Sequence, residues 1–199
     1  MKLRSHVCCL LGGLMTVALA EASADCEVRY SQEDYRLHVE TIEAAIRRQD
    51  EQTALNRIEG LRQMLPCASE ALARNIVGSI HRMMAYESHL RGDEKRAREA
   101  LMGAQVSDRH YEFPEDLLPT GHPLRVLYEG DLGHTSSLYA PAHPPDFKIY
   151  PAVNGIMDGA LCRNRASFVQ LWAVDKGYFA SYYVWPGETV EAWMAPLKE

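Results

Sequence analysis

The sequence predicts an α+β fold, in which antiparallel α-hairpins come first and a small antiparallel β-sandwich or meander follows. Apolar residues recur at helical spacing in four successive segments between residues 31 and 106. From residue 147 onward, short aromatic and β-branched runs alternate with glycine-containing turns, which is typical of strands. We therefore divide the 199 residues into a leader (1–24), a helical domain (25–129), a linker (130–146) and a β domain (147–199).

The leader has the pattern of a secretory signal peptide. Lys2 and Arg4 precede an apolar run over residues 7–20, which is short for a membrane span. Residues 22–24, Ala-Ser-Ala, have the small side chains that a signal peptidase requires. We expect cleavage after Ala24 and a periplasmic or secreted mature chain; an uncleaved anchor is the alternative.

Charge and composition narrow the range of partners. The chain has a formal net charge of -6, and removal of the leader would leave 19 basic and 26 acidic residues. No basic stripe remains, so neither nucleic acid nor an anionic membrane surface is an expected partner. The apolar content of 47% is that of a globular protein rather than a disordered one.

Three cysteines would remain in the mature chain, namely Cys26, Cys67 and Cys162. In an oxidising compartment an odd number leaves one thiol unpaired. Cys26 precedes the first predicted helix and Cys67 follows the second, and these two ends lie side by side in an antiparallel hairpin. We therefore predict a Cys26–Cys67 disulfide, and we expect Cys162 to be a small buried residue rather than a nucleophile.

Capping signals give the helix boundaries. Ser31 is a predicted N-cap with Asp34 three residues later, as in a capping box. Gly92 suits the left-handed position after a helix, and Asp93 can cap the next one. Pro123 favours the first position of a short helix, which would cover the end of the helical stack. The predicted helices span about residues 31–48, 54–65, 68–90, 93–106 and 123–128.

The second hairpin can be laid over the first with a shift of 43 residues. Asp50 then falls on Asp93, Ala54 on Ala97, Ile58 on Leu101 and Leu61 on Ala104. This pattern resembles the tetratricopeptide repeat (TPR), although the early tryptophan is absent and the shift exceeds the usual 34 residues. The resemblance covers residues 32–106 and implies a helical stack that binds other proteins. A plain four-helix arrangement without repeat ancestry is the alternative.

Strands are expected over residues 147–153, 167–174, 178–185 and 189–193, with Asn154-Gly155 as a turn. Pro151 would place the first of them at a sheet edge. Val153-Asn154-Gly155 and Gly177-Tyr178 loosely resemble PEGA-type modules of bacterial envelope proteins, although the PEGA tetrapeptide itself is absent. Because a region of this size is marginal alone, we expect it to pack on the helices.

No motif for catalysis, a cofactor or a metal is found in the sequence. His81 and His89 are eight residues apart, whereas a zinc-binding helix needs a spacing of four. There is no GxSxG elbow and no phosphate loop. We predict no catalytic residue, cofactor or metal. The alternative is an enzyme or metal site around the loop histidines or around the third cysteine, residues His122, His134, His143 and Cys162.

Aromatic residues of the β domain form a candidate binding surface, made of Trp172, Tyr182, Trp185 and Trp193. Exposed Trp and Tyr suit sugar stacking or protein contacts, whereas a small domain also needs them for its core.

The function that the sequence favours is an exported, non-catalytic protein–protein interaction or scaffold protein of the cell envelope. A module that binds cell-wall or surface polysaccharide through these aromatics is the alternative.

Overall fold

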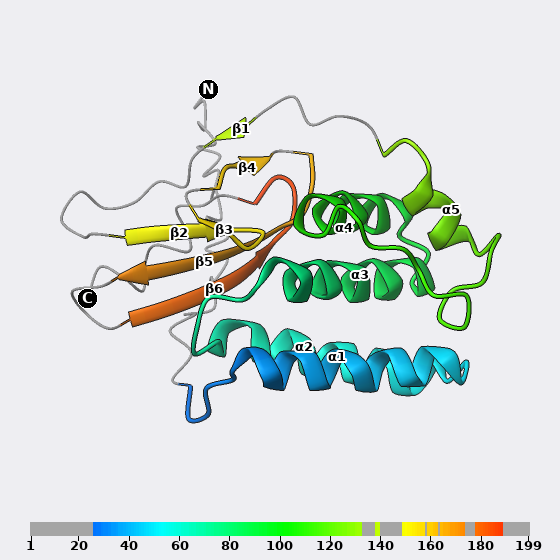
Figure 1. The fold of residues 1–199 in the computed structure, drawn as a ribbon, viewed down its shortest axis with the longest axis horizontal. Coiled ribbons are helices and arrows are strands. Elements are labelled where there is room, and N and C mark those ends of the chain that lie inside the picture. The colour runs from blue at the N-terminus through cyan, green and yellow to red at the C-terminus, as the bar shows by residue number, and fades with distance from the viewer. Residues whose placement is uncertain are drawn as a thin grey trace, which may run out of the picture.

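A computed structural model gives the structure of residues 26–132, 138–139, 149–157, 159–162, 164–173 and 178–188. Within these residues, five α-helices precede a C-terminal four-stranded antiparallel sheet, so the prediction of an α+β fold is confirmed (Figure 1). The predicted leader, most of the predicted linker and the predicted strand 189–193, which includes Trp193, lie outside the described residues.

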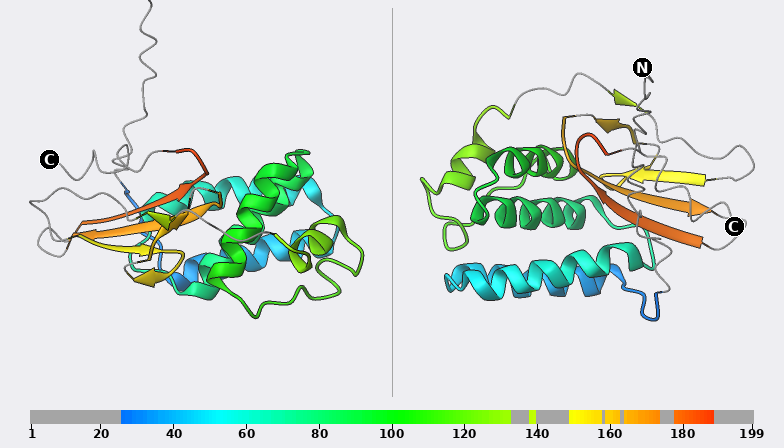
Figure 2. Two further views of the ribbon diagram at one scale, coloured as in Figure 1. Left: turned by 90° about the horizontal axis from the view of Figure 1, so that it is seen from above. Right: turned by 180° about the vertical axis from the view of Figure 1, so that it is seen from behind.

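The helices are α1 (Gln32–Arg47), α2 (Glu51–Met64), α3 (Arg74–Leu90), α4 (Glu94–Ser107) and α5 (Pro123–Glu129), with the 3-10 turn η1 (Leu65–Cys67) after α2. The strands are β1 (Leu138–Tyr139), β2 (Ile149–Val153), β3 (Ile156–Met157), β4 (Leu161–Cys162), β5 (Ser167–Ala173) and β6 (Tyr178–Val184). Helices α1 and α2 form one antiparallel hairpin and α3 and α4 form another (Figures 1 and 2).

The two hairpin turns have the same backbone conformation. Asp50 has φ -92° and ψ 78°, and Asp93 has φ -91° and ψ 77°. Each is preceded by a residue with positive φ, Gln49 at 57° and Gly92 at 73°. Each aspartate accepts a hydrogen bond from the backbone N–H three residues later, at 3.1 and 3.0 Å. The 43-residue shift therefore superposes two equal turns, while membership of the TPR family stays a prediction.

Helix α3 begins later than the sequence predicts. The prediction started it near Ala68, whereas the first helical residue is Arg74. Ala68 instead forms a parallel bridge with Tyr30. The backbone N–H of Leu72 donates to Oε1 of Gln170 at 2.8 Å. Because these partners come from distant parts of the chain, the segment before α3 is held extended.

The predicted disulfide is present. Cys26 and Cys67 are bonded, with their Cα atoms 5.6 Å apart. The bond ties the start of the described chain to the end of η1, beside the hydrogen bond from Tyr30 N–H to the Cys67 carbonyl at 2.9 Å. Cys162 is a free, buried thiol, as expected.

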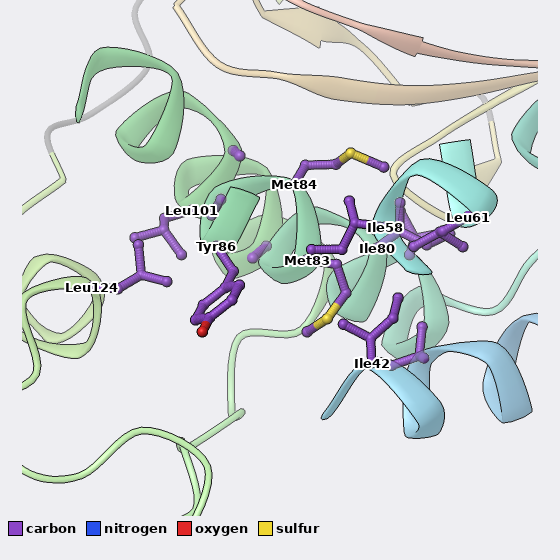
Figure 3. Packing of buried hydrophobic residues seen from close by; sticks show 14 of the residues in the cluster. Ile42, Ile58, Leu61, Ile80, Met83, Met84, Tyr86, Leu101 and Leu124 are labelled. Atoms are coloured by element: carbon purple, nitrogen blue, oxygen red, sulfur yellow. The ribbon is translucent and has the colours of Figure 1, made fainter. Parts of the chain in front are cut away.

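Helix α3 is the centre of the hydrophobic core. Figure 3 shows Ile80 and Met83 of α3 pointing toward Ile42 of α1 and Ile58 of α2. Leu101 of α4 and Leu124 of α5 complete the other side of the same cluster. Helix α5 begins at Pro123 and buries Leu124 and Tyr128, so the predicted short helix does cover one end of the stack.

The four-stranded sheet has the order β3-β2-β5-β6, and a second pair joins β1 to β4. Asn154 and Gly155 both have positive φ, which makes the predicted two-residue turn between β2 and β3. The expectation that Pro151 places its strand at a sheet edge is wrong, since β2 lies between β3 and β5. The proline is tolerated there because β3 is short and pairs only with Ala152 and Val153, so Pro151 faces no residue of β3. Phe168 of β5 is fully buried in the helical core, which confirms that the sheet packs on the helices.

Candidate functional site

A groove lies between α1 and α3 and has a volume of about 280 Å³. Val39 and Ile76 give it apolar walls, and Tyr111, in the segment after α4, adds an aromatic ring to the lining. Its polar lining comes from both helices and from the same segment: Arg36, Glu40, Glu43, Asn75, Ser79, Arg82 and Asp108. We call it the α1–α3 groove; it joins residues that are more than thirty positions apart in the sequence.

Arg82 fixes one wall of the α1–α3 groove. Its guanidinium carbon lies 3.3 Å from the centroid of the Tyr111 ring, which is a stacked cation–π contact. Nη2 donates to Ser79 Oγ at 2.7 Å, and Nη1 lies 3.5 Å from an oxygen of Asp108. Only 3% of Arg82 is exposed, and this burial lowers the pKa of its side chain. These contacts and this burial hold the Arg82 side chain in one position, so this wall of the groove is preformed.

The rim charges that α1 contributes to the α1–α3 groove are paired, mostly with other residues of α1. Arg36 pairs with Glu33 and Glu40 of the same helix. Glu43 pairs with Arg47 at 3.4 Å, and Arg47 also pairs at 2.9 Å with Asp116 in the segment after α4. These pairs within α1 have the spacing of neighbours on one helix face. The two pairs of Arg36 are exposed, so each of them contributes little to stability. The groove therefore offers apolar walls and hydrogen-bonding groups without a strong net charge.

A second hollow, of about 510 Å³, lies over the other side of α1, between α1 and α2. We call it the α1–α2 hollow; its lining includes Tyr30, Leu37, His38, Thr41, Gly60 and Met64. Leu37 is 47% exposed there. Nε2 of His38 lies 2.7 Å from the Arg57 carbonyl, and because a carbonyl only accepts, this nitrogen carries the proton.

His81 joins the helices to the sheet and is fully buried. Nε2 lies 2.9 Å from Asn154 Oδ1, and Nδ1 lies 2.9 Å from the hydroxyl of Tyr183. Asn154 Oδ1 also accepts the backbone N–H of Phe168, which identifies it as the amide oxygen. Nε2 of His81 therefore donates, and Nδ1 accepts from Tyr183. We call these three side chains the His81 joint.

The electrostatics of the His81 joint keep it neutral. Burial, together with the smaller effect of the nearby charges of Arg165 and Arg82, lowers the pKa of His81 to about 4, although the hydrogen bond to Asn154 acts in the opposite direction. Burial of its hydroxyl raises the pKa of Tyr183 well above the usual value. Because His81 and Asn154 are shielded from solvent, the joint holds two parts of the fold together rather than presenting a reactive group.

Glycine makes room for each hairpin's histidine. A Cβ on Gly103 would lie 2.5 Å from the His81 ring and 2.9 Å from the Ala166 carbonyl oxygen. A Cβ on Gly60 would lie 3.3 Å from the His38 ring. His38 and Gly60 fall on His81 and Gly103 with the same shift of 43 residues that relates the turns. The recurrence of this histidine–glycine pair can be read from the sequence, but the pattern of apolar residues does not include it.

The structure does not bring the predicted aromatic surface together. Trp172 is 47% exposed, whereas Trp185 stacks edge-on against Tyr183 with ring centroids 5.1 Å apart. Register pairs Trp172 with Phe179, so Tyr182 falls on the opposite face of the sheet from Trp172. Of the four predicted residues, Trp193 lies outside the described range. A binding role for these aromatics stays a prediction.

His89 and His122 contact each other at the start of α5. Nδ1 of His122 accepts the N–H of Leu124 at 3.2 Å and caps α5, with the His89 ring 5.4 Å away. Burial, and then the charge of His89, lower the pKa of His122. His134 and His143 lie outside the described residues. Among the residues that the structure describes, no group of three or more His, Cys, Asp or Glu side chains is arranged to hold a metal ion.

Comparisons with protein-family models, curated proteins and solved structures found no match. Over the described ranges, none of the helices has the length and apolar character needed to cross a membrane.

Proposed function

We propose that the protein is an exported, non-catalytic interaction or scaffold protein of the cell envelope, and that its α1–α3 groove binds a segment of another protein. The observation that carries the proposal is the preformed groove itself, with apolar walls and a buried arginine stacked on Tyr111. A cavity of about 280 Å³ accommodates one or two side chains, so we expect an anchor residue and a flanking helix or extended segment.

Two further observations support this proposal. The Cys26–Cys67 disulfide is typical of a protein that matures in an oxidising compartment, which agrees with the signal-peptide pattern of the leader. The buried His81 joint, although made of residue types that catalyse reactions elsewhere, holds the sheet on the helices. This favours a binding role over a catalytic one.

A pull-down from envelope extracts tests the proposal. Asn75 is exposed and lines the groove, so Asn75→Trp should fill it without disturbing the core. Gln52→Trp, at an exposed position of α2 outside the groove, is the matched control. We expect partners that the parent and Gln52→Trp retain and that Asn75→Trp loses at least tenfold. Equal recovery by all three proteins would contradict the proposal.

Polysaccharide binding is the second candidate, and one observation favours it. Tyr150 and Trp172 are directly opposite each other on β2 and β5, with 44% and 47% of each residue exposed. Two exposed aromatic rings on a sheet face can stack on the apolar face of a sugar. Co-sedimentation with cell-wall glycan should weaken for Trp172→Ala but not for Leu37→Ala, an exposed apolar control on α1. Equal sedimentation of the two variants would exclude this candidate.

A further inference from the structure

A larger cavity adjoins the α1–α3 groove where α4 ends. It has a volume of about 600 Å³, against about 280 Å³ for the groove. Asn75 of α3 and Asp108, which follows α4, line both of them. We call the larger one the end cavity; its lining is Arg74, Asn75, Ser107, Asp108, Arg109 and His110. Because the two cavities share wall residues from two different elements, a segment bound in the groove can continue into the end cavity.

The end cavity is formed by the close approach of the chain after α4 to the start of α3. A Cβ on Gly78 would lie 2.8 Å from the Cβ of Asp108, so a glycine is needed at this point of α3. Nη2 and Nε of Arg74 donate to the carbonyls of the last two residues of α4, at 2.7 and 3.2 Å. The end of α4 is therefore fixed beside the first turn of α3, and the following residues Arg109 and His110 line the cavity.

The end cavity is basic, although the chain as a whole has a formal net charge of -6. Asp108 is the acidic residue of its described lining, and the buried Arg82 lies 3.5 Å from that carboxylate. Arg109 and His110 are exposed, and within the described chain neither side chain forms an ion pair or a hydrogen bond. The first turn of α3 has no acidic residue, and its N-cap Ala73 makes no side-chain hydrogen bond, so the helix dipole adds to the positive potential.

We propose that the segment bound by the α1–α3 groove is acidic: an apolar anchor side chain fills the groove, and neighbouring Asp or Glu side chains enter the end cavity. This rests on the proposed function, since it concerns the same groove. The guanidinium of Arg109 has the paired donors that bind a carboxylate, and Asn75 can donate from the shared wall. The end cavity has about twice the volume of the groove, so it accommodates several side chains rather than one terminal carboxylate.

Short peptides with one leucine anchor test the preference for acidic segments. The acidic probes are acetyl-Leu-Gly-Asp-Glu-Asp-amide and the same residues in reverse order. In the neutral probes, Asn and Gln replace Asp and Glu. Each is titrated into the isotope-labelled exported chain, and NMR follows the backbone amides of Ile76 in the groove and Arg109 in the end cavity.

The expected result is a salt-dependent preference. At least one acidic probe should bind at least tenfold more tightly than its neutral counterpart at about 0.05 M salt, and less than threefold more tightly at about 0.5 M, because exposed charges are screened. The shifts should saturate together at both amides, since one segment occupies both cavities.

Charge-reversing variants locate the contact. Arg109→Glu reverses an unpaired cation of the end cavity, and Arg57→Glu makes the same change at an exposed position of α2 outside the groove and the end cavity. We expect the tenfold advantage of the acidic probe to disappear in Arg109→Glu and to persist in Arg57→Glu. The neutral probe should bind Arg109→Glu as it binds the parent, which distinguishes a lost charge contact from damage to the groove.

Three outcomes would overturn the proposal. One is equal binding of the acidic and neutral probes, or no shift with any probe at about 5 mM, a concentration at which even weak complexes form. Another is an equal loss of the acidic advantage in Arg109→Glu and Arg57→Glu. The third is tighter binding by acetyl-Gly-Gly-Leu-Gly with a free terminal carboxylate than by either acidic probe.

The pull-down from envelope extracts separates this proposal from the proposed function. Partners that Asn75→Trp loses should also be lost at least tenfold by Arg109→Glu and retained by Arg57→Glu. If Arg109→Glu retains them, the groove binds protein but the bound segment is not acidic. If Asn75→Trp itself retains every partner, the proposed function fails and the acidic segment fails with it.

Discussion

The two helical hairpins share their turns and their histidine–glycine pairs but differ in what covers them. Asp50 and Asp93 cap α2 and α4 with the same backbone angles. The first hairpin keeps one face open as the α1–α2 hollow and is closed at its end by a disulfide. The second is covered on the corresponding face by the sheet, through the His81 joint. The same turn and the same histidine–glycine pair thus occur once beside an open hollow and once beneath the sheet.

The difference shows that neighbours, rather than local sequence, decide how much of a helix is buried. Helix α3 buries polar residues such as Glu87, whose counterpart in α1 is the half-buried Ala44. Glu87 is held by Arg62 of α2 and by Arg91, the latter at 2.7 Å. A buried carboxylate of this kind requires paired charges, and here one comes from the neighbouring helix α2 and the other from the C-cap of α3 itself.

Among the changes that distinguish the two hairpins, breaking the disulfide of the first should lower the free energy of unfolding the most. Replacing Cys26 and Cys67 by serine releases a loop with a sequence separation of 41 residues. On the chain-entropy estimate this lowers the free energy of unfolding by about 4 kcal/mol. Denaturant unfolding of the parent with and without a reducing agent, and of the double variant, measures it. Equal midpoints would show that the first hairpin does not depend on the bond.

Substituting Gly103 should have the next largest effect. Gly103→Ala places a Cβ against the His81 ring, which two hydrogen bonds hold in place, and against the backbone of Ala166. We expect a loss of about 2 to 3 kcal/mol, because an overpacked interface must move. Thermal unfolding followed by circular dichroism measures the loss. A neutral or stabilising result would mean that the sheet is not packed tightly on α4.

The sequence predicts the elements whose signals are local. Ser31 and Asp34 form the predicted capping box, with both hydrogen bonds in place. Asp93 caps α4 and Pro123 begins α5, as expected. In each case the partner is within a few residues, so composition and spacing contain the information. The disulfide was predictable for a related reason, since an antiparallel hairpin brings its two ends together.

Non-local contacts explain what the sequence does not predict. Leu72 stays outside α3 because its N–H bonds a side chain 98 residues later. The contact of Arg82 with Tyr111 also depends on the packing of separate segments. The sequence shows that a histidine recurs after 43 residues, as His38 and His81. Only the structure shows that their environments differ, because His38 lines an open hollow and His81 is fully buried.

Acidification should destabilise the second hairpin through His81. The fold lowers the pKa of His81 to about 4, from about 6.5 in the unfolded chain, so it favours the neutral ring. The stabilisation is complete above pH 6.5 and is lost as the pH falls toward 4. Between pH 7.5 and pH 5 this amounts to about 2 kcal/mol of unfolding free energy. Denaturant unfolding at the two pH values measures it.

The control for this effect removes the titrating ring. His81→Gln keeps hydrogen-bonding groups at the joint but has no ionisable nitrogen. Over the same pH range, the free energy of unfolding of the variant should therefore fall by about 2 kcal/mol less than that of the parent. The difference between parent and variant cancels the carboxylates, which titrate in both. An identical pH dependence in the two proteins would rule out His81 as the source.

Gly60 should tolerate an alanine substitution, whereas Gly103 should not. The expected change in stability is small, but it tests directly whether the first hairpin is open where the second is covered. Gly60→Ala brings a Cβ to 3.3 Å from the His38 ring, which lies at the rim of an open hollow and can move by a few tenths of an ångström. Alanine also favours a helix interior over glycine by up to about 1 kcal/mol. We therefore expect a gain of roughly 0.5 kcal/mol in thermal unfolding. A loss as large as that of Gly103→Ala would mean that the α1–α2 hollow is covered in solution, as its counterpart is by the sheet.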